Sequence, residues 1–294
     1  MSTDAPAVQA APLKAEHPLS EAWRMFRRNR SALGGLILLG LILLVAVFGP
    51  VIYPYDPFEI VGKPLTPPGQ RGFVLGTDYM GRDTLAGLIH GSRPTLLVGA
   101  AAALFTLAIG ITIGAFSGYY GGWVESALMR LTEVFLVLHP LLLAMVVATL
   151  FNPSLLTIVA AIGISSWPGT ARLTRAEFLK VREQDYVMAA RAVAAPRRYL
   201  IWRVVFPNCL PPLIVMAALR VASAILFEAM LSFLGLGDPR VMSWGYMIGL
   251  SRDFIFQSWW SVTLPGAAIF LTVLSISLVG DGLQDAFNPK LRER

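Results

Sequence analysis

Six stretches of this sequence are apolar over roughly the length that a helix needs to cross a lipid bilayer. The hydrocarbon core of a bilayer is about 30 Å thick, and about 20 apolar helical residues span it. The fourth stretch is short: it covers only about 20 Å at 1.5 Å per residue, so it must borrow flanking residues or lie partly within protein. The six stretches are residues 33–52, 94–117, 127–150, 155–167, 210–236 and 262–279. They predict an all-α polytopic membrane protein with about six transmembrane helices.

Composition excludes the soluble alternatives. Only 14% of the residues are charged, whereas soluble domains carry about 25%. At 55% hydrophobic residues, the chain is also too apolar to be intrinsically disordered. The single cysteine, Cys209, cannot form an internal disulfide, and the three histidines lie in separate segments, so no metal site is predicted. The first apolar stretch begins only at residue 33 and exceeds the roughly 7–15 residues of a signal-peptide core, which favours a retained anchor.

The distribution of Lys and Arg predicts the orientation in the membrane. With the N-terminus inside the cell, the internal segments hold 16 of the 24 basic residues, and the external segments hold six basic and six acidic residues. Internal loops of membrane proteins carry the excess of Lys and Arg, so both termini are predicted to be cytoplasmic. The internal segments are 1–32, 170–208 and 281–294, the external loops are 53–93 and 237–261, and the transmembrane body is 33–280.

The external segment 53–93 contains five prolines, so it is not one long helix. It is either a docking surface for an external partner or a packed cap on the outer mouth. Within it, Asp78, Arg82 and Asp83 are expected to form an ordered turn with a local ion pair.

Four glycines at a spacing of four lie in and just after the second apolar stretch. On a helix, Gly110, Gly114, Gly118 and Gly122 would form a groove of bare backbone that a neighbouring helix can approach closely. Ordinary helix packing and a moving interface both fit this pattern.

Charged residues within membrane spans are costly and are therefore candidates for functional sites. Arg130 and Glu133 are three residues apart and can pair on one helix face. Arg220 and Glu228 are about two turns apart, too far to pair directly. Glu133, Arg220 and Glu228 are predicted either to face a path through the membrane or to hold helices together.

The internal segment 170–208 is long, strongly basic and helical in character, and loops of this length are usually functional. Its alanine-rich surface is followed by Pro196 and an amphipathic stretch, 197–206. Short helices that present small residues are suited to docking in a partner's groove. The arginines alone would equally explain a segment that rests on anionic lipid headgroups.

Residues 188–207 resemble the EAA motif of ATP-binding-cassette importer permeases, which reads Glu-Ala-Ala, three residues, Gly, nine residues, Ile-x-Leu-Pro. The spacing matches throughout, and Ala189, Ala190 and Pro207 match in identity. Met188 replaces the Glu and Ala194 replaces the Gly. Because alanine disfavours a positive φ, the turn at Ala194 is expected to be looser or differently made.

Three further blocks resemble the second permease subunit of dipeptide, oligopeptide and nickel importers: residues 75–83, 118–123 and 228–237. The resemblance covers roughly residues 20 to 290. It implies a type I ABC importer permease fold in the bacterial cytoplasmic (inner) membrane. It also implies four kinds of partner: a second homologous permease, two cytoplasmic ATP-binding subunits, an extracytoplasmic substrate-binding protein and the lipid bilayer, with no nucleic acid. By this resemblance, the residues that couple to the ATPase are Tyr186, Ala189, Ala190, Arg191, Ala192, Ala194, Ala195, Pro196 and Pro207.

The predicted function is that of a permease subunit that moves short peptides, or related small solutes, across the membrane. The sequence has no Gly-x-x-x-x-Gly-Lys-Ser/Thr phosphate loop. We therefore expect no ATPase site and no cofactor on this chain, with ATP and Mg²⁺ bound by the partner subunits. Importers of nickel, opines or glutathione fit a similar permease. A secondary transporter driven by an ion gradient would show an inverted repeat and a midplane ion site, and neither is apparent.

Overall fold

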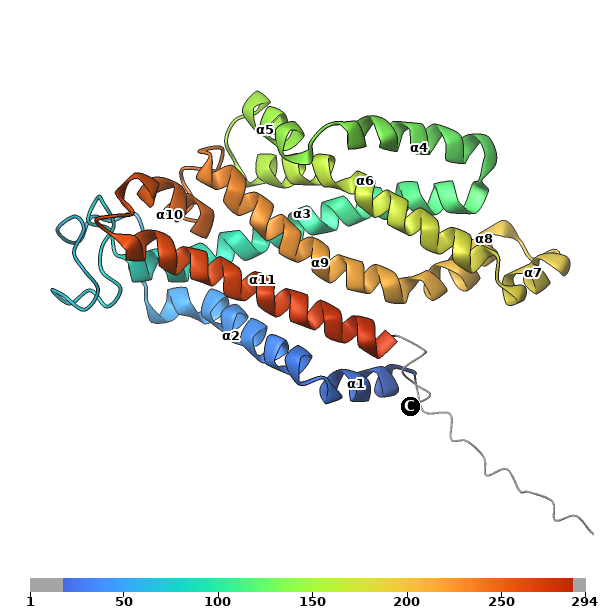
Figure 1. Cartoon of the computed structure of the whole chain (residues 1–294), viewed down its shortest axis with the longest axis horizontal. Helices are drawn as coiled ribbons and strands as arrows, with labels where there is room; N and C mark the ends of the chain where they lie inside the picture. The colour runs from blue at the N-terminus through green and yellow to red at the C-terminus, as the bar shows by residue number, and fades with distance from the viewer. Residues whose placement is uncertain (1–17, 288–294) are drawn as a thin grey trace, which may run out of the picture.

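The computed structural model describes residues 18–287, and within this range the chain is built from helices (Figure 1). Parts of both expected tails, residues 1–17 and 288–294, lie outside the described range. In chain order the elements are α1 (Pro18–Arg28), α2 (Arg30–Ile52), α3 (Thr84–Tyr120), α4 (Gly122–Val137), α5 (Pro140–Leu150), α6 (Leu155–Arg182), α7 (Asp185–Ala192), α8 (Arg197–Tyr199), a π-helical turn η1 (Leu200–Val205), α9 (Phe206–Phe233), α10 (Trp244–Ser251), a 3-10 turn η2 (Arg252–Phe254) and α11 (Trp259–Phe287).

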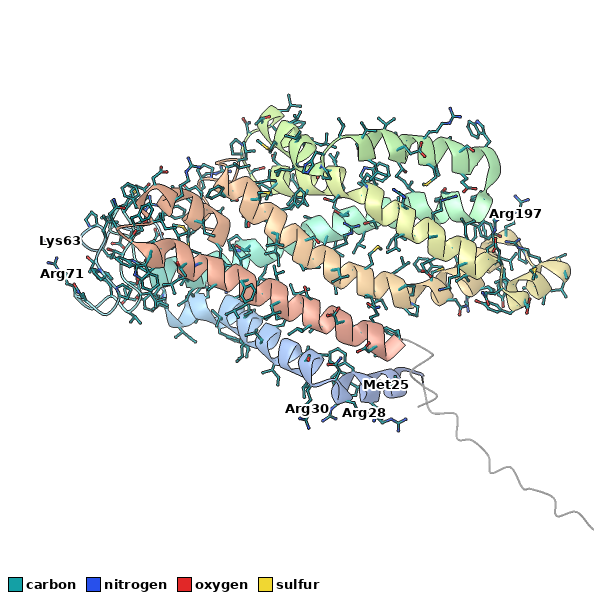
Figure 2. All side chains as sticks on the ribbon, viewed as in Figure 1. Met25, Arg28, Arg30, Lys63, Arg71 and Arg197 are labelled. Atoms are coloured by element: carbon teal, nitrogen blue, oxygen red, sulfur yellow. The ribbon has the colours of Figure 1, made fainter. Side chains whose placement is uncertain are left out.

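The chain passes along the bundle as α2, α3, the α4–α5 pair, α6, α9 and α11 (Figure 1). Loop 53–83 and α10 lie at one end, called here the α10 end. Helices α7 and α8 and both described ends of the chain lie towards the other, the α7 end (Figure 1). Lys63 and Arg71 lie at the α10 end, whereas Arg28, Arg30 and Arg197 lie towards the α7 end (Figure 2).

Within the described residues, four helices are long and apolar enough to cross a membrane. The bent pair α4–α5 makes a fifth. Helix α6 also runs along the bundle (Figure 1) but is not among these apolar helices, and its second half (residues 170–182) is polar. These observations confirm the multi-pass helical class.

The helix bounds differ from the predicted spans in three places. The second span is part of a 37-residue helix that begins ten residues earlier than predicted, because the Asp83 carboxylate caps it by accepting from the Leu85 amide at 2.9 Å. The third span is broken: α4 and α5 meet at an angle of 86° just before Pro140. Residues 170–182, expected in the internal segment, continue α6.

Small residues let the helices approach closely. The most extensive helix–helix contact is between α3 and α6, with α11 packed on α2 and α9.

Residues 18–32, expected as tail, form α1 and the start of α2. Phe26 and Ala32 pack there against Ala286, near the end of α11.

The loop at the α10 end is ordered by polar contacts. The Thr77 hydroxyl donates to the Lys63 carbonyl at 2.6 Å and accepts from the Thr66 amide at 2.9 Å. The Trp260 indole donates to the Thr77 carbonyl at 3.1 Å, which fastens the loop to α11. Asp78 Oδ1 accepts from two backbone amides, at 2.8 and 2.9 Å. These bonds make the ordered turn that was predicted.

The ion pair expected in this turn is not formed among the described residues. Arg82 instead lies over the Phe58 ring, 5.4 Å from its centroid. Asp83 accepts from the Tyr53 hydroxyl at 2.5 Å. Burial, followed by this hydrogen bond, raises the pKa of Tyr53 to about 12. Burial also raises the pKa of Asp78 above its ordinary value, against the opposing effect of its backbone hydrogen bonds.

Candidate functional site

Helix α7 is an eight-residue helix that projects at one end of the bundle (Figure 1). Val187 is fully buried and anchors α7 in a cluster that includes Phe178 of α6 and Leu200 of η1. Ala190 and Ala195 are half-buried and pack against the same cluster. In α7 and the turn after it, the predicted coupling residues that are exposed are Tyr186, Ala189, Arg191, Ala192, Ala194 and Pro196. One face of α7 therefore holds the helix on the bundle, and the other exposes Ala189 and Ala192 beside larger side chains such as Tyr186.

The turn after α7 is made by an alanine in a glycine-like conformation. Ala194 has φ +58°, in the left-handed region. The Ala195 amide donates to the Ala190 carbonyl at 3.2 Å, and the Ala194 amide donates to the Arg191 carbonyl at 2.9 Å. These two bonds are those of a Schellman motif, which usually has glycine at this position. The expectation that alanine would produce a looser or different turn is wrong, because the two bonds hold Ala194 in the left-handed region.

Several arginines of the basic segment make contacts inside the chain. Arg175 of α6 forms an ion pair with Glu125 of α4. Arg182 donates to the carbonyls of Gly118 and Tyr119, at 3.2 and 3.1 Å, and so caps the C-terminal end of α3. These contacts could not be predicted from the sequence, because each arginine contacts residues at least 50 positions away in the chain.

Arg191 also contributes to the position of α7. Its guanidinium lies 6.0 Å from the centre of the Tyr119 ring, at the end of α3. Contact of a cation with an aromatic face contributes about 0.5–1 kcal/mol at an exposed site. Arg191 therefore helps to seat α7 on the bundle.

A helical segment leads from α7 into α9. Helix α8, the π-helical turn η1 and α9 follow one another without a break, and Pro207 lies in the first turn of α9. The Asn208 side chain donates to the Val204 carbonyl at 2.6 Å across this junction. Such π-helical turns are frequent at functional sites.

Three of the four spaced glycines lie in the contact between α3 and α6. A Cβ atom on Gly110 would lie 2.5 Å from the Thr170 side chain, and one on Gly114 would lie 2.4 Å from the Ala171 carbonyl oxygen. A Cβ on Gly118 would lie 2.7 Å from Phe178 Cβ. These distances are too short for any side chain, so this face requires glycine. Gly122 has open space around it and lies outside this contact, as the first residue of α4.

A polar groove runs between α4 and α6. It contains a cavity of about 530 Å³ that Glu133 lines, together with four other charged residues: Glu125, Arg130, Arg172 and Arg175. The expected pair of Arg130 with Glu133 is not formed within the described range, where Glu125 pairs with Arg175 instead. Glu133 thus faces an open polar cavity.

A second cavity, of about 280 Å³, lies at the break between α4 and α5. Arg220 of α9 lines it, as does Pro140 at the start of α5. Pro140 in the middle of the third predicted span is the signal that could have located the break and its cavity.

Glu228 lies in a different environment. Its side chain is only 1% exposed, and its Oε1 accepts from the Ser232 hydroxyl at 2.8 Å, one turn further along α9. As the spacing indicated, Glu228 and Arg220 do not pair in the described structure. This geometry favours the structural alternative for Glu228 over a place on an open path. In the part of the chain that the structure describes, no group of three or more His, Cys, Asp or Glu side chains could hold a metal ion.

Comparison with known proteins places these features in a family. Residues 110–293 match the family described as "Binding-protein-dependent transport system inner membrane component". The chain belongs to this family. Residues 17–68 match a second family, described as "N-terminal TM domain of oligopeptide transport permease C". The recognition made from the EAA-like motif and the three further blocks is thereby confirmed, and the chain is a multi-pass inner-membrane permease.

Relatives with curated names resemble the chain over nearly its whole length. A "Di/tripeptide transport system permease protein DppC" of Pseudomonas aeruginosa is 45% identical, with 94% of this chain and 93% of the relative covered. A "Dipeptide transport system permease protein DppC" of Haemophilus influenzae is 39% identical, with 94% and 96% covered. That of Escherichia coli K12 is 41% identical, with 94% of each chain covered.

Solved structures share the fold at low sequence identity. A chain of the MetNI methionine ABC transporter, in an inward-facing conformation, superposes with a TM-score of 0.57 at 17% identity, covering 69% of this chain and 97% of that one. A chain of an amino acid ABC transporter superposes with a TM-score of 0.54 at 16% identity, covering 67% and 92%. The fold is therefore that of ABC importer permeases.

Proposed function

We propose that this chain is the transmembrane permease subunit of an ATP-driven importer of short peptides, dipeptides in particular. The observation that carries the proposal is the exposed face of α7 around Ala189 and Ala192, on a helix held on the bundle by Val187 and Arg191 in a chain of this family. Relatives named as di/tripeptide and dipeptide permeases supply the substrate class. This chain carries no ATPase site and binds no cofactor, and partner subunits hold ATP and Mg²⁺.

Each contact of α7 gives a route by which movement of an ATPase reaches the membrane helices. Val187 joins α7 to α6, Arg191 joins it to the end of α3, and η1 leads directly into α9. A switch between two packed arrangements needs packed connections of this kind rather than a loose loop. The ATPase-coupling residues are therefore proposed to be Tyr186, Ala189, Ala190, Arg191, Ala192, Ala194, Ala195, Pro196 and Pro207.

The two ends of the bundle take different partners in this proposal. Because internal segments carry the excess of basic residues, we propose that the α7 end faces the cytoplasm, with both termini on that side. A pair of ATP-binding subunits docks there. The ordered loop 53–83 and α10 face outside, where an extracytoplasmic binding protein delivers the peptide. A second permease covers the α4–α6 groove, which forms this chain's half of the path.

Purification of the complex tests the docking face. We would express the tagged chain in its native host, purify it in mild detergent and identify the proteins that accompany it. Ala189→Trp adds bulk to the outward face of α7 and is expected to lose the ATPase subunits. Ala176→Trp, at an exposed alanine of α6, is the matched control and should retain them. Loss of the ATPases from both variants, or from neither, would contradict the assignment of the docking face.

Uptake into proteoliposomes tests the substrate. The purified complex should import a radiolabelled dipeptide only with its binding protein outside and ATP inside. Import by the lone chain without ATP would overturn the proposal in favour of a gradient-driven transporter.

A further inference from the structure

The cavity at the break between α4 and α5 lies at the middle of the bundle. Arg220 is about 20 Å from either end of α9 at 1.5 Å per residue, which places it near the centre of the membrane. Residues from four other helices close around it, and the cavity measures about 280 Å³. Its principal lining residues are Thr106, Phe135, Pro140, Ser166, Gly169 and Phe227.

Arg220 is a cation without a partner at this depth. Within residues 18–287 it makes neither an ion pair nor a hydrogen bond. A guanidinium near the bilayer centre is costly unless an anion or a polar site compensates it. Gly169 leaves room beside the charge, because a Cβ there would lie 3.0 Å from Arg220 Nη2. The guanidinium therefore remains available to a ligand in the cavity.

The other lining groups give the cavity an excess of positive charge. No acidic residue lines it, unlike the neighbouring cavity with Glu125 and Glu133. Two of its hydroxyls, on Ser165 and Ser223, donate to carbonyls of their own helices at 3.0 and 2.9 Å. Helix α5 begins at this cavity without a side-chain cap, so the positive end of its dipole adds to the charge of Arg220. This arrangement favours an anion.

We infer that the cavity binds the carboxylate of the peptide during its passage, with Arg220 as the anchor. The inference rests on the proposed function, since it assigns one end of the proposed substrate to a site within the path. A guanidinium binds a carboxylate through two parallel hydrogen bonds, which also orient the ligand. Phe135 and Phe227 line the same cavity and offer apolar surface to the adjoining part of the peptide. The competing occupant is an acidic side chain of the second permease.

The experiment compares substrates and variants in the complete reconstituted transporter. Import of dialanine and of dialanine amide is measured in proteoliposomes, with the binding protein present at saturating concentration for each peptide. Arg220→Met removes the charge at similar length, and Arg220→Lys keeps it. We expect Arg220→Met to reduce dialanine import about 10- to 100-fold, the effect of losing hydrogen bonds to a charged group. Amide import should change less than twofold, and Arg220→Lys should restore part of the dialanine import.

The outcomes separate this inference from the proposed function. If the wild-type complex imports neither peptide, the proposed function fails and the inference fails with it. If dialanine import is normal in Arg220→Met, or both peptides are impaired equally, the inference is overturned while peptide import stands. Loss of the second permease on purification of Arg220→Met would assign the anion to that subunit and also overturn it. If import of dialanine amide is too slow to measure, dialanine import is compared between the two variants instead. Equal losses of dialanine import in Arg220→Met and Arg220→Lys would then overturn the inference.

Discussion

Replacing Ala194 with glycine is expected to stabilise the turn after α7. The left-handed conformation, here φ +58° at Ala194, costs an L-residue roughly 1–2 kcal/mol, and glycine avoids this cost. Glycine also gains backbone entropy in the opened state, which reduces this stabilisation by about 0.4–1 kcal/mol. The difference leaves a net gain on the order of 0.5–1 kcal/mol for the closed turn.

Ala192→Gly is the matched control, because it makes the same substitution two residues earlier, in the last helical position of α7. Glycine within a helix is destabilising by roughly 0.5–1 kcal/mol relative to alanine, so the two substitutions should have opposite signs.

Hydrogen exchange at the amides that close the turn measures the effect directly. The amides of Val193, Ala194 and Ala195 donate to carbonyls of α7 at 3.3, 2.9 and 3.2 Å. Protection of these amides reports the free energy of local opening. We expect Ala194→Gly to raise the protection about two- to fivefold, and Ala192→Gly to lower it by a similar factor, since 1.4 kcal/mol corresponds to a factor of ten. Reduced protection in both variants would refute the left-handed assignment of Ala194 and the role of the Schellman bonds.

Three further predictions concern stability, each followed by thermal unfolding of the purified chain in detergent. Gly114→Ala should destabilise the chain by about 1–3 kcal/mol, because its Cβ would lie 2.4 Å from an α6 carbonyl. Gly266→Ala, where a Cβ meets nothing within 4 Å, should be neutral or stabilising by up to about 1 kcal/mol, and equal losses would contradict the packing of α3 on α6. Asp78→Ala should cost about 1–3 kcal/mol by leaving two amides without an acceptor, whereas Asp78→Asn keeps the oxygen that accepts both bonds and should cost less than 1 kcal/mol. Burial raises the pKa of Asp78, so protonation of its carboxylate favours the folded state. The unfolding free energy of the wild type should therefore rise relative to that of Asp78→Asn as the pH falls from 7 towards 4. A fall in this stability difference over the same range would show that burial does not dominate the pKa of Asp78.

The break in the third span was only partly predictable from the sequence. Pro140 was visible as a proline within an apolar stretch, and proline is a usual cause of a kink. The angle of 86° between α4 and α5 depends on how α6 packs against the pair, and the cavity beside Arg220 also needs the α9 residues that line it. No local pattern carries that information.

The arginines of the internal segment show the same division. Their number correctly marked one end of the bundle as the basic one, because charge asymmetry is a property of composition along the chain. Their partners were not predictable, because Arg175 and Arg182 contact residues of α4 and α3 that are 50 and more than 60 positions away in the chain.

The sequence by itself determined the class of protein, a multi-pass helical membrane protein, and its family. Each of these depends on local properties, namely the length of apolar runs, the spacing of small residues and short blocks of identity. Only the tertiary structure decided that Ala194 makes a glycine-like turn, that Gly122 lies outside the glycine face, and that Arg220 faces a cavity while Glu228 is sealed. The physical reason is that a conformation disfavoured at one residue, or a charge buried at one depth, is set by neighbours that the fold brings together from distant helices.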